Sequence, residues 1–345
     1  MKLIRLLQFI LVLILLPEMA CTPANSSPVL IDTKVCGLSL VAPPNPFSED
    51  PIPPIQHVGA NWIAVCPFAF TREGTNWVRY NSQWQWWGEK PEGVKKSIEL
   101  AHAANIKVML KPHVYFPGSW PGALEFDKES DWESWENDFT NYIMDFAAIA
   151  QEMDVELFSI GVEFKKSVVV REAFWRGLIQ KVKTVYNGPL TYSANWDEFQ
   201  SVPFWDALDY IGIDAYFPLL DHKTPDVKAL TKSWRPHLEK IRTVYKKTNK
   251  PVLFTEFGYL SVDGCAYNTW ELEAQIHSLE LNEQAQANAF DALFTVFWNE
   301  PWWHGGFVWK WFPNMEGHEG YPAKDYTPQG KTCESILREW YSNNR

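Results

Sequence analysis

Two glutamates stand directly behind short apolar segments, at positions where side-chain packing gives no reason for a charge. Glu163 comes after residues 155–160, and Glu256 comes after residues 252–255. An unpaired buried carboxylate is costly, so a chain keeps one for function or within an ion pair. Two carboxyl groups in one site supply a proton donor for a leaving oxygen and a nucleophile or base on the other side. Hydrolysis of a glycosidic bond requires such a pair.

Polar and aromatic residues follow other apolar segments in the same way. We expect Lys111 and His113 to bind sugar hydroxyls or to hold Glu163, with a simple strand-end ion pair as the alternative. We expect Tyr216 to donate a hydrogen bond to the nucleophile. The full candidate substrate-binding set is Lys111, His113, Asn195, Trp196, Asp197, Asp214, Tyr216, Trp309 and Trp311.

Tryptophan is unusually abundant, with 19 tryptophans among 345 residues. Indole rings stack on the C–H faces of sugar rings, so we expect part of this set to line a groove and the rest to fill the core. Trp309 and Trp311 lie two residues apart on one predicted strand, so both should face the same cavity. Trp84, Trp86 and Trp87 form either a second sugar subsite or a cluster that anchors a loop.

Several other classes of function are excluded by what the sequence lacks. It has no G-x-S-x-G nucleophile elbow and no H-E-x-x-H zinc motif. A net charge of −11 without a basic stripe argues against nucleic-acid binding. Cys36, Cys66, Cys265 and Cys333 lack metal-ligand spacing, so we expect mostly free, buried thiols and no metal or organic cofactor.

Eight short β-rich segments alternate with helical patterns along the chain. Apolar residues recur with helical spacing over residues 132–149, 175–185 and 230–245, and a last helix is expected over 335–341. This alternation predicts an α/β fold, a single (β/α)₈ TIM barrel over residues 37–345, whose active site lies at the C-terminal ends of the strands. An open doubly wound sheet is the alternative, but the first strand lacks its glycine-rich phosphate loop. The predicted strands are residues 37–41, 62–66, 106–110, 155–160, 190–193, 210–213, 252–255 and 307–309.

The first 20 residues have the pattern of an export signal peptide. Two basic residues precede an apolar segment, and a small residue, Ala20, stands directly before Cys21. Cys21 is a candidate lipidation site, and residues 21–36 are a candidate tether. We therefore expect an exported monomer that meets the membrane only through this lipid, at the periplasmic or cell surface, or a secreted protein.

The sequence resembles the retaining glycoside hydrolases of clan A, and most closely family 113, which contains β-mannanases. The resemblance runs from about residue 37 to residue 341. It implies that Glu163 is the acid/base and Glu256 the nucleophile in double displacement on a β-linked oligo- or polysaccharide of the β-mannan type. The alternative function is a non-catalytic, cell-surface glycan-binding barrel that uses the same tryptophans. The segments that carry the resemblance are residues 157–164, 188–197, 208–218, 251–259 and 306–312.

Two positions depart from the pattern of clan A. Many members have an asparagine directly before the acid/base, in contact with the sugar 2-OH. Here Val162 takes that position, so we expect the contact from elsewhere, such as Asn195. Glu300 stands in Asn-Glu-Pro, which looks like the acid/base tripeptide of other members. It precedes the eighth predicted strand, which places it at the opposite end of the barrel.

Overall fold

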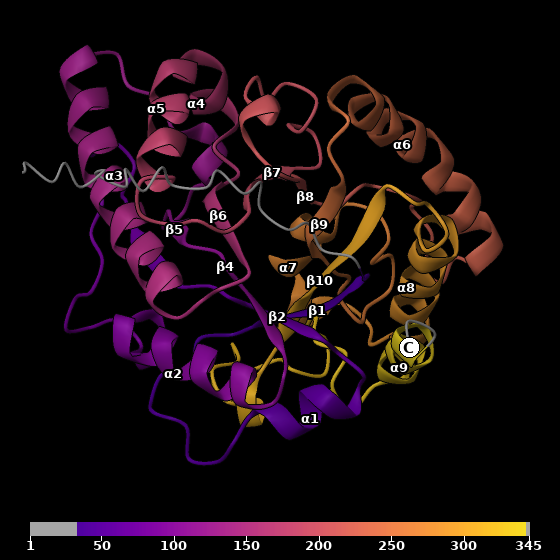
Figure 1. The fold of residues 1–345 in the computed structure, drawn as a ribbon. Helices are drawn as coiled ribbons and strands as arrows, with labels where there is room; N and C mark the ends of the chain where they lie inside the picture. The colour runs from indigo at the N-terminus through magenta and orange to yellow at the C-terminus, as the bar shows by residue number, and fades with distance from the viewer. Residues whose placement is uncertain (1–32, 343–345) are drawn as a thin grey trace, which may run out of the picture.

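The computed structural model describes residues 33–342 and has eight parallel strands that close into one barrel (Figure 1). The closed barrel confirms the predicted TIM-barrel fold and rules out the open sheet. All eight predicted strands are present, with ends that differ by a few residues. In their order around the barrel, the strands are β1 (Val35–Leu40), β2 (Trp62–Val65), β4 (Lys107–Leu110), β6 (Leu157–Val162), β7 (Leu190–Asn195), β8 (Ile211–Asp214), β9 (Val252–Phe257) and β10 (Trp303–Trp311).

Helices surround the strands, as Figure 1 shows. Each of the four predicted helical segments falls on a helix, and α3 (Glu129–Glu152) buries Trp135, Phe139 and Phe146 against the barrel. Asp226 caps α6 (Val227–Thr248), where its side chain accepts a hydrogen bond from the Ala229 amide. The helices are α1 (Ile52–His57), α2 (Pro91–Ala103), α3 (Glu129–Glu152), α4 (Lys165–Val170), α5 (Glu172–Val182), α6 (Val227–Thr248), α7 (Thr269–Glu273), α8 (Glu283–Phe297) and α9 (Thr332–Ser342).

Alternate residues of each strand face the helices or the inside of the barrel. In β2, Ile63 and Val65 join the large core under the helices, whereas Trp62 and Ala64 belong to a separate buried cluster. This inner cluster fills the barrel, so the cavity at the strand ends has a solid floor. Its members are Val35, Trp62, Ala64, Cys66, Met109, Leu157, Tyr210, Leu253 and Phe307.

The structure differs from the predicted elements in three places. Two short parallel strands, β3 (Phe68–Phe70) and β5 (His113–Tyr115), continue β2 and β4 beyond the barrel and were not predicted. β10 begins at Trp303, four residues before its predicted start. β1 begins at Val35, so the last two residues of the predicted tether belong to the barrel instead.

The predictions for the N-terminus and for the cysteines have different outcomes. The signal peptide and Cys21 lie outside the described residues, so their assignment stays a prediction. Cys36, Cys66, Cys265 and Cys333 are buried, and Cys66, Cys265 and Cys333 are free thiols, as expected. Within residues 33–342, none of the helices is long and apolar enough to cross a membrane.

Glu300 lies just before β10, at the N-terminal end of the barrel. Its carboxylate accepts a hydrogen bond from Arg242, with a distance of 2.7 Å between Oε1 and Nη2. Both side chains are partly exposed, and exposed pairs of this kind contribute little to stability. The position confirms that Glu300 is remote from the candidate site.

Glu300→Ala should therefore lower the free energy of unfolding by less than about 1 kcal/mol. It should leave unchanged the glycosidase activity that the sequence predicts, because the residue lies at the opposite end of the barrel. Denaturant unfolding and a steady-state assay measure the two effects. Loss of hydrolysis in Glu300→Ala, with hydrolysis retained in Glu163→Ala, would contradict the strand assignment.

Candidate active site

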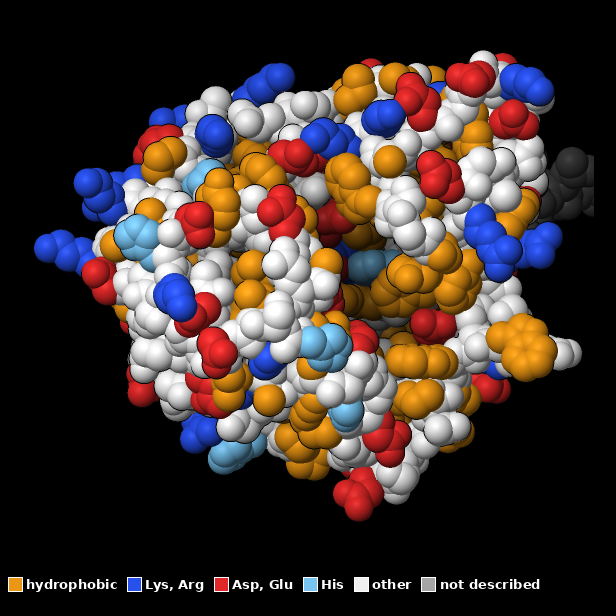
Figure 2. Space-filling model, turned by 180° about the vertical axis from the view of Figure 1, so that it is seen from behind, with side chains coloured by type: hydrophobic (Ala, Val, Ile, Leu, Met, Phe, Trp, Pro, Cys, Tyr) orange, Lys and Arg blue, Asp and Glu red, His pale blue; other side chains and the backbone are white. Residues whose placement is uncertain are grey.

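A cavity of about 620 Å³ opens at the C-terminal ends of the strands. Figure 2 shows it as a hollow in the middle of one face, with hydrophobic side chains gathered around its mouth. Both glutamates singled out in the sequence, Glu163 and Glu256, line it. The other lining residues are Phe68, His113, Val114, Tyr115, Phe116, Ser119, Trp120, Pro121, Val162, Asn195, Trp196, Asp197, Tyr216, Thr269, Trp270, Trp309 and Tyr326.

Glu163 follows β6 in the left-handed region of backbone conformation, with φ of 59°. Residues other than glycine rarely adopt this conformation, and it persists where neighbouring contacts fix it. The amide of Glu163 donates to the carbonyl of Ser193 at 2.8 Å, and the next amide, that of Phe164, donates to the Tyr192 hydroxyl at 2.6 Å. Glu198 accepts the Tyr192 proton at 2.6 Å. These bonds to β7 and the loop after it aim the Glu163 side chain into the cavity.

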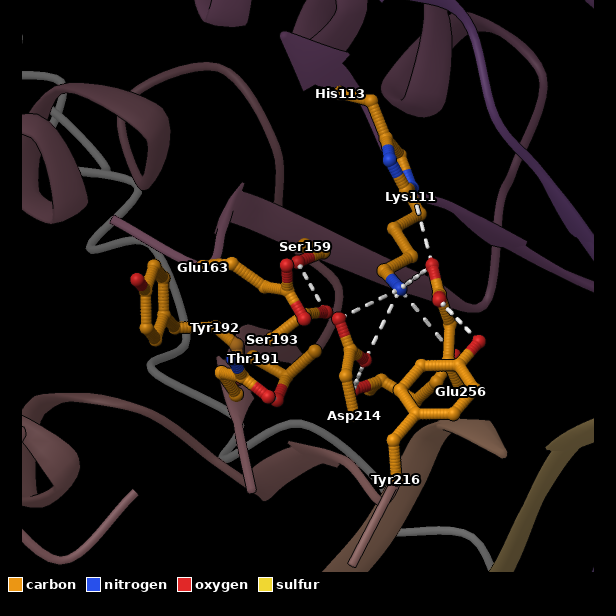
Figure 3. Close-up of polar contacts among 12 residues, drawn as sticks. Lys111, His113, Ser159, Glu163, Thr191, Tyr192, Ser193, Asp214, Tyr216 and Glu256 are labelled. Carbon is orange, nitrogen blue, oxygen red and sulfur yellow. Dashed lines mark hydrogen bonds and ion pairs between the residues drawn. The ribbon is translucent and has the colours of Figure 1, made fainter. Parts of the chain in front are cut away.

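Glu256 lies within β9 and has a donor on each carboxylate oxygen (Figure 3). The ammonium of Lys111 lies 2.6 Å from Oε1, and the hydroxyl of Tyr216 donates to Oε2 at 2.9 Å. The expected bond from Tyr216 to this glutamate is therefore present. Charge-assisted bonds of this kind stabilise the ionised carboxylate.

Lys111 and Asp214 are fully buried behind Glu256. The ammonium lies 3.1 Å from Oδ1 of Asp214, which also accepts the Thr255 hydroxyl at 2.7 Å. Neither residue is among those that line the cavity, and Lys111 forms the strand-end ion pair that was the alternative to sugar binding. Lys111, which follows β4, and Asp214, which ends β8, thus hold the Glu256 carboxylate from behind.

The surroundings of the two glutamates differ in electrostatics. Burial raises the pKa of Glu163 well above its ordinary value, and the negative charges of Asp214 and Glu256 raise it further. Burial disfavours the charged form of Lys111, but the charges of Asp214 and Glu256 outweigh it and hold the lysine pKa above its ordinary value. Burial also raises the pKa of Asp214 to about 7. The site therefore pairs Glu163, whose pKa is raised, with a Glu256 carboxylate that is bound to a cation.

His113 and Trp309 form an adjoining wall of the cavity. Their rings are stacked, with centroids 6.1 Å apart. Burial, and then the charge of Lys111, lower the pKa of His113 well below its ordinary value, so the imidazole is neutral. Its Nε2 lies 3.5 Å from Oε1 of Glu256, so His113 and Lys111 adjoin Glu256 and not Glu163.

Trp311 does not share the orientation predicted for it. Its side chain is only 2% exposed, it packs in the core, and it does not line the cavity. The pairing of β10 with β1 shifts register between Leu38 and Leu40, and an extra residue of β10 fits into that interval. The shift breaks the strand alternation on which the prediction rested.

Asn195, Trp196 and Asp197 line the cavity as predicted. Trp196 stacks on Trp270 from α7, with ring centroids 5.6 Å apart and planes at 24°. Asp197 is paired with Lys165 at 2.5 Å, so its carboxylate already has a cationic partner.

Several cavity residues come from long loops and were not predicted from the sequence. Trp120, in the loop between β5 and α3, donates from Nε1 to Oε2 of Glu163 at 2.7 Å. Trp270 and Tyr326 come from the segments that follow β9 and β10. Long loops at the catalytic end of a barrel are a signal of function, but they have no periodicity from which to place individual side chains.

Comparisons with known proteins agree on one family. The family model for Glycoside Hydrolase Family 113 matches residues 45–331. The structure is similar to that of the family 113 β-mannanase AaManA from Alicyclobacillus acidocaldarius in complex with ManMIm. The two are 25% identical with a TM-score of 0.78, and the match covers 91% of this chain and 98% of that one.

Two further solved structures share the fold. A family 113 β-1,4-mannanase complex is 25% identical with a TM-score of 0.77, and the match covers 90% of this chain and 99% of that one. A Faecalibacterium prausnitzii β-glucuronidase is 14% identical with a TM-score of 0.60, over 91% of this chain and 49% of that one, and shares the fold alone. A comparison with curated proteins gave no match.

Lys111→Met should destabilise the protein by about 3–5 kcal/mol, because it leaves two carboxylates buried without their cation. The deficit should shrink as pH falls, since burial raises the pKa of Asp214 to about 7 and its protonation removes part of the uncompensated charge. Adding Asp214→Asn to Lys111→Met should restore part of the stability. Denaturant unfolding at several pH values measures these effects.

Lys95→Met is the matched control, because Lys95 forms a solvent-exposed pair with Glu152. It should cost less than about 1 kcal/mol. Equal losses in the two lysine variants would contradict the role given to the buried ammonium.

Proposed function

Because the chain belongs to glycoside hydrolase family 113, we propose that it hydrolyses β-linked, mannan-type glycans with retention of anomeric configuration. The observation that carries this proposal is that Glu163 and Glu256 line one cavity in opposite electrostatic settings. A raised pKa suits a proton donor, and a carboxylate held by a cation suits a nucleophile. Two carboxyl groups with these separate roles are what double displacement needs.

In the first step, Glu163 donates its proton to the glycosidic oxygen while Glu256 attacks the anomeric carbon. The C–O bond to the leaving group breaks as the bond from Glu256 to the anomeric carbon forms. Lys111 and Tyr216 hold the two oxygens of Glu256 before the attack and direct its side chain into the cavity. Loss of the carboxylate charge leaves the ammonium with Asp214 as its partner.

In the second step, the Glu163 carboxylate takes a proton from water, and the water oxygen attacks the anomeric carbon. The bond to Glu256 breaks, and the sugar leaves with its original configuration after two inversions. The carboxyl group of Glu163 performs both proton transfers and that of Glu256 is the nucleophile, so this mechanism requires no metal or organic cofactor.

The mannan preference rests on the similar enzymes and on the character of the cavity. Both family 113 structures described above are mannanases by name. Aromatic rings such as Trp196, Trp270 and Trp309 line the cavity and suit neutral pyranose rings. Val162 presents an apolar side chain where many clan A enzymes have asparagine, so we propose Asn195 as the polar contact to the 2-OH.

The roles of the two glutamates are separated by substrates with different leaving groups. Glu256→Ala should reduce activity by several orders of magnitude on every substrate, and azide should give a product of inverted configuration. Glu163→Ala should still cleave a dinitrophenyl β-manno-oligosaccharide in the first step, because this leaving group needs no protonation. Azide should then accelerate turnover with retained configuration. Steady-state kinetics and NMR of the azide products measure both outcomes.

Glu300→Ala is the matched control and should behave as the wild type. A wild-type protein that binds manno-oligosaccharides but releases no reducing sugar would refute the proposal and favour the non-catalytic glycan-binding barrel. Rescue of Glu163→Ala with inverted configuration would exchange the two roles.

We also propose export and lipidation at Cys21, on the basis of the signal-peptide pattern of residues 1–20. The mature protein should partition into detergent, and Cys21→Ser should release it as soluble protein. Mass spectrometry of the mature N-terminus tests this directly. An unmodified Cys21 would refute lipidation and leave plain secretion as the alternative.

A further inference from the structure

The loop between β5 and α3 places one side chain directly on the candidate acid/base. Nε1 of Trp120 donates to Oε2 of Glu163 at 2.7 Å. In the described part of the chain, it is the one side chain found within hydrogen-bond distance of that carboxyl group. Both residues line the cavity, so the bond forms at the point where the glycosidic oxygen would be protonated.

The chemistry of the indole decides which oxygen of Glu163 carries the proton. An indole N–H donates and cannot accept, so the oxygen that it contacts must act as an acceptor. A protonated carboxyl group has one hydroxyl oxygen and one carbonyl oxygen. The carbonyl oxygen is the better acceptor of the two, so the bond from Trp120 favours the carbonyl at Oε2 and the hydroxyl at Oε1. We propose that Trp120 is a positioning residue that assigns the transferable proton to Oε1 of Glu163.

This assignment, which rests on the proposed glycosidase function, holds through both steps of double displacement. In the first step, Oε1 gives its proton to the leaving oxygen while Oε2 keeps its bond to Trp120. In the second step, Oε1 takes the proton of the attacking water and returns to the starting state. One oxygen therefore exchanges protons and the other stays fixed, so Glu163 needs no rotation between steps.

Trp120 also acts on the affinity of Glu163 for its proton. The hydrogen bond from its N–H group is stronger to a carboxylate than to a neutral acid, so it lowers the pKa of Glu163. Burial has the larger and opposite effect, and raises this pKa. The bond therefore limits how far burial raises this pKa. An acid that is too reluctant to lose its proton could not give it to the leaving oxygen in the first step.

The position of the indole depends on a glycine two residues later. A Cβ atom at Gly122 would lie 2.2 Å from Cη2 of Trp120 and 2.4 Å from Cζ3, well inside contact distance. Any side chain at residue 122 would therefore push the indole off its site. Gly122 is itself buried in the short 3₁₀ turn Pro121–Ala123. In the sequence Trp-Pro-Gly, Trp120 is thus the hydrogen-bond donor, and Gly122 leaves the space that its indole ring occupies.

The same loop offers a matched control. Nε1 of Trp132, at the start of α3, donates to the carbonyl of Phe126 at 3.0 Å and anchors the far end of the loop. Trp132→Phe removes an indole hydrogen bond from this loop without touching Glu163. A purely structural role of the loop would make Trp120→Phe and Trp132→Phe behave alike.

The experiment compares pH profiles of kcat/KM for wild type, Trp120→Phe, Gly122→Ala and Trp132→Phe on manno-oligosaccharides. The alkaline limb of wild type reports deprotonation of Glu163. In Trp120→Phe and Gly122→Ala it should move upward by about one pH unit, since a bond to a charged acceptor has been lost. Activity on manno-oligosaccharides should fall about tenfold or more, and cleavage of a dinitrophenyl substrate should fall much less. Trp132→Phe should keep the wild-type profile.

Three outcomes would overturn the inference. The first is an unchanged alkaline limb in both Trp120→Phe and Gly122→Ala. The second is the same shift in Trp132→Phe. The third is a raised KM with an unchanged limb, which would make Trp120 a sugar contact only. Each requires an active wild type, so failure of the proposed function, an inactive wild type, is distinguishable from failure of this inference.

Discussion

The candidate site depends on one buried cation. Lys111 is enclosed at the end of β4, and its ammonium contacts both Glu256 and Asp214. Its charge acts on Glu163 only as the last and smallest of several influences, and the donor to Glu163 is the neutral indole of Trp120. Three acidic groups close to one ammonium cannot all remain charged at low cost, so the proton resides where cationic support is weakest. Burial is the larger cause of the raised Glu163 pKa, and together with it the position of this ammonium separates two chemically identical side chains into an acid and a nucleophile.

The barrel makes this separation possible because neighbouring strands deliver side chains to one end at fixed spacing. The interior cluster closes the barrel below the site and keeps water away from Lys111. Tryptophan serves both parts of the structure. Trp135, Trp175 and Trp234 are buried under the helices, whereas Trp120, Trp196, Trp270 and Trp309 line the cavity. The abundance of tryptophan thus reflects a dense core and an apolar site.

The sequence was sufficient for the barrel, for both glutamates and for Tyr216, because strand periodicity places the residue at each strand end. The sequence was insufficient where tertiary contacts determine the direction in which a side chain points. Lys111 and Asp214 stand at strand ends, yet they turn behind Glu256 and away from the cavity, which one strand alone cannot reveal. Trp311 packs in the core and not in the cavity, because the register between β10 and β1 shifts. Trp120 comes from an irregular loop, and only its neighbours in space identify it.

The most direct test of this account is the titration of the Glu163 carboxyl group itself. Protein labelled with ¹³C at glutamate carboxyl carbons is followed by NMR over pH, and the signal that disappears in Glu163→Gln is assigned to Glu163. The account predicts that this signal titrates well above the ordinary glutamate value of about 4.3, and moves to lower pH in Glu256→Gln, where a neighbouring charge is removed. A Glu163 signal that titrates at or below about 4.3, or that ignores Glu256→Gln, would contradict it.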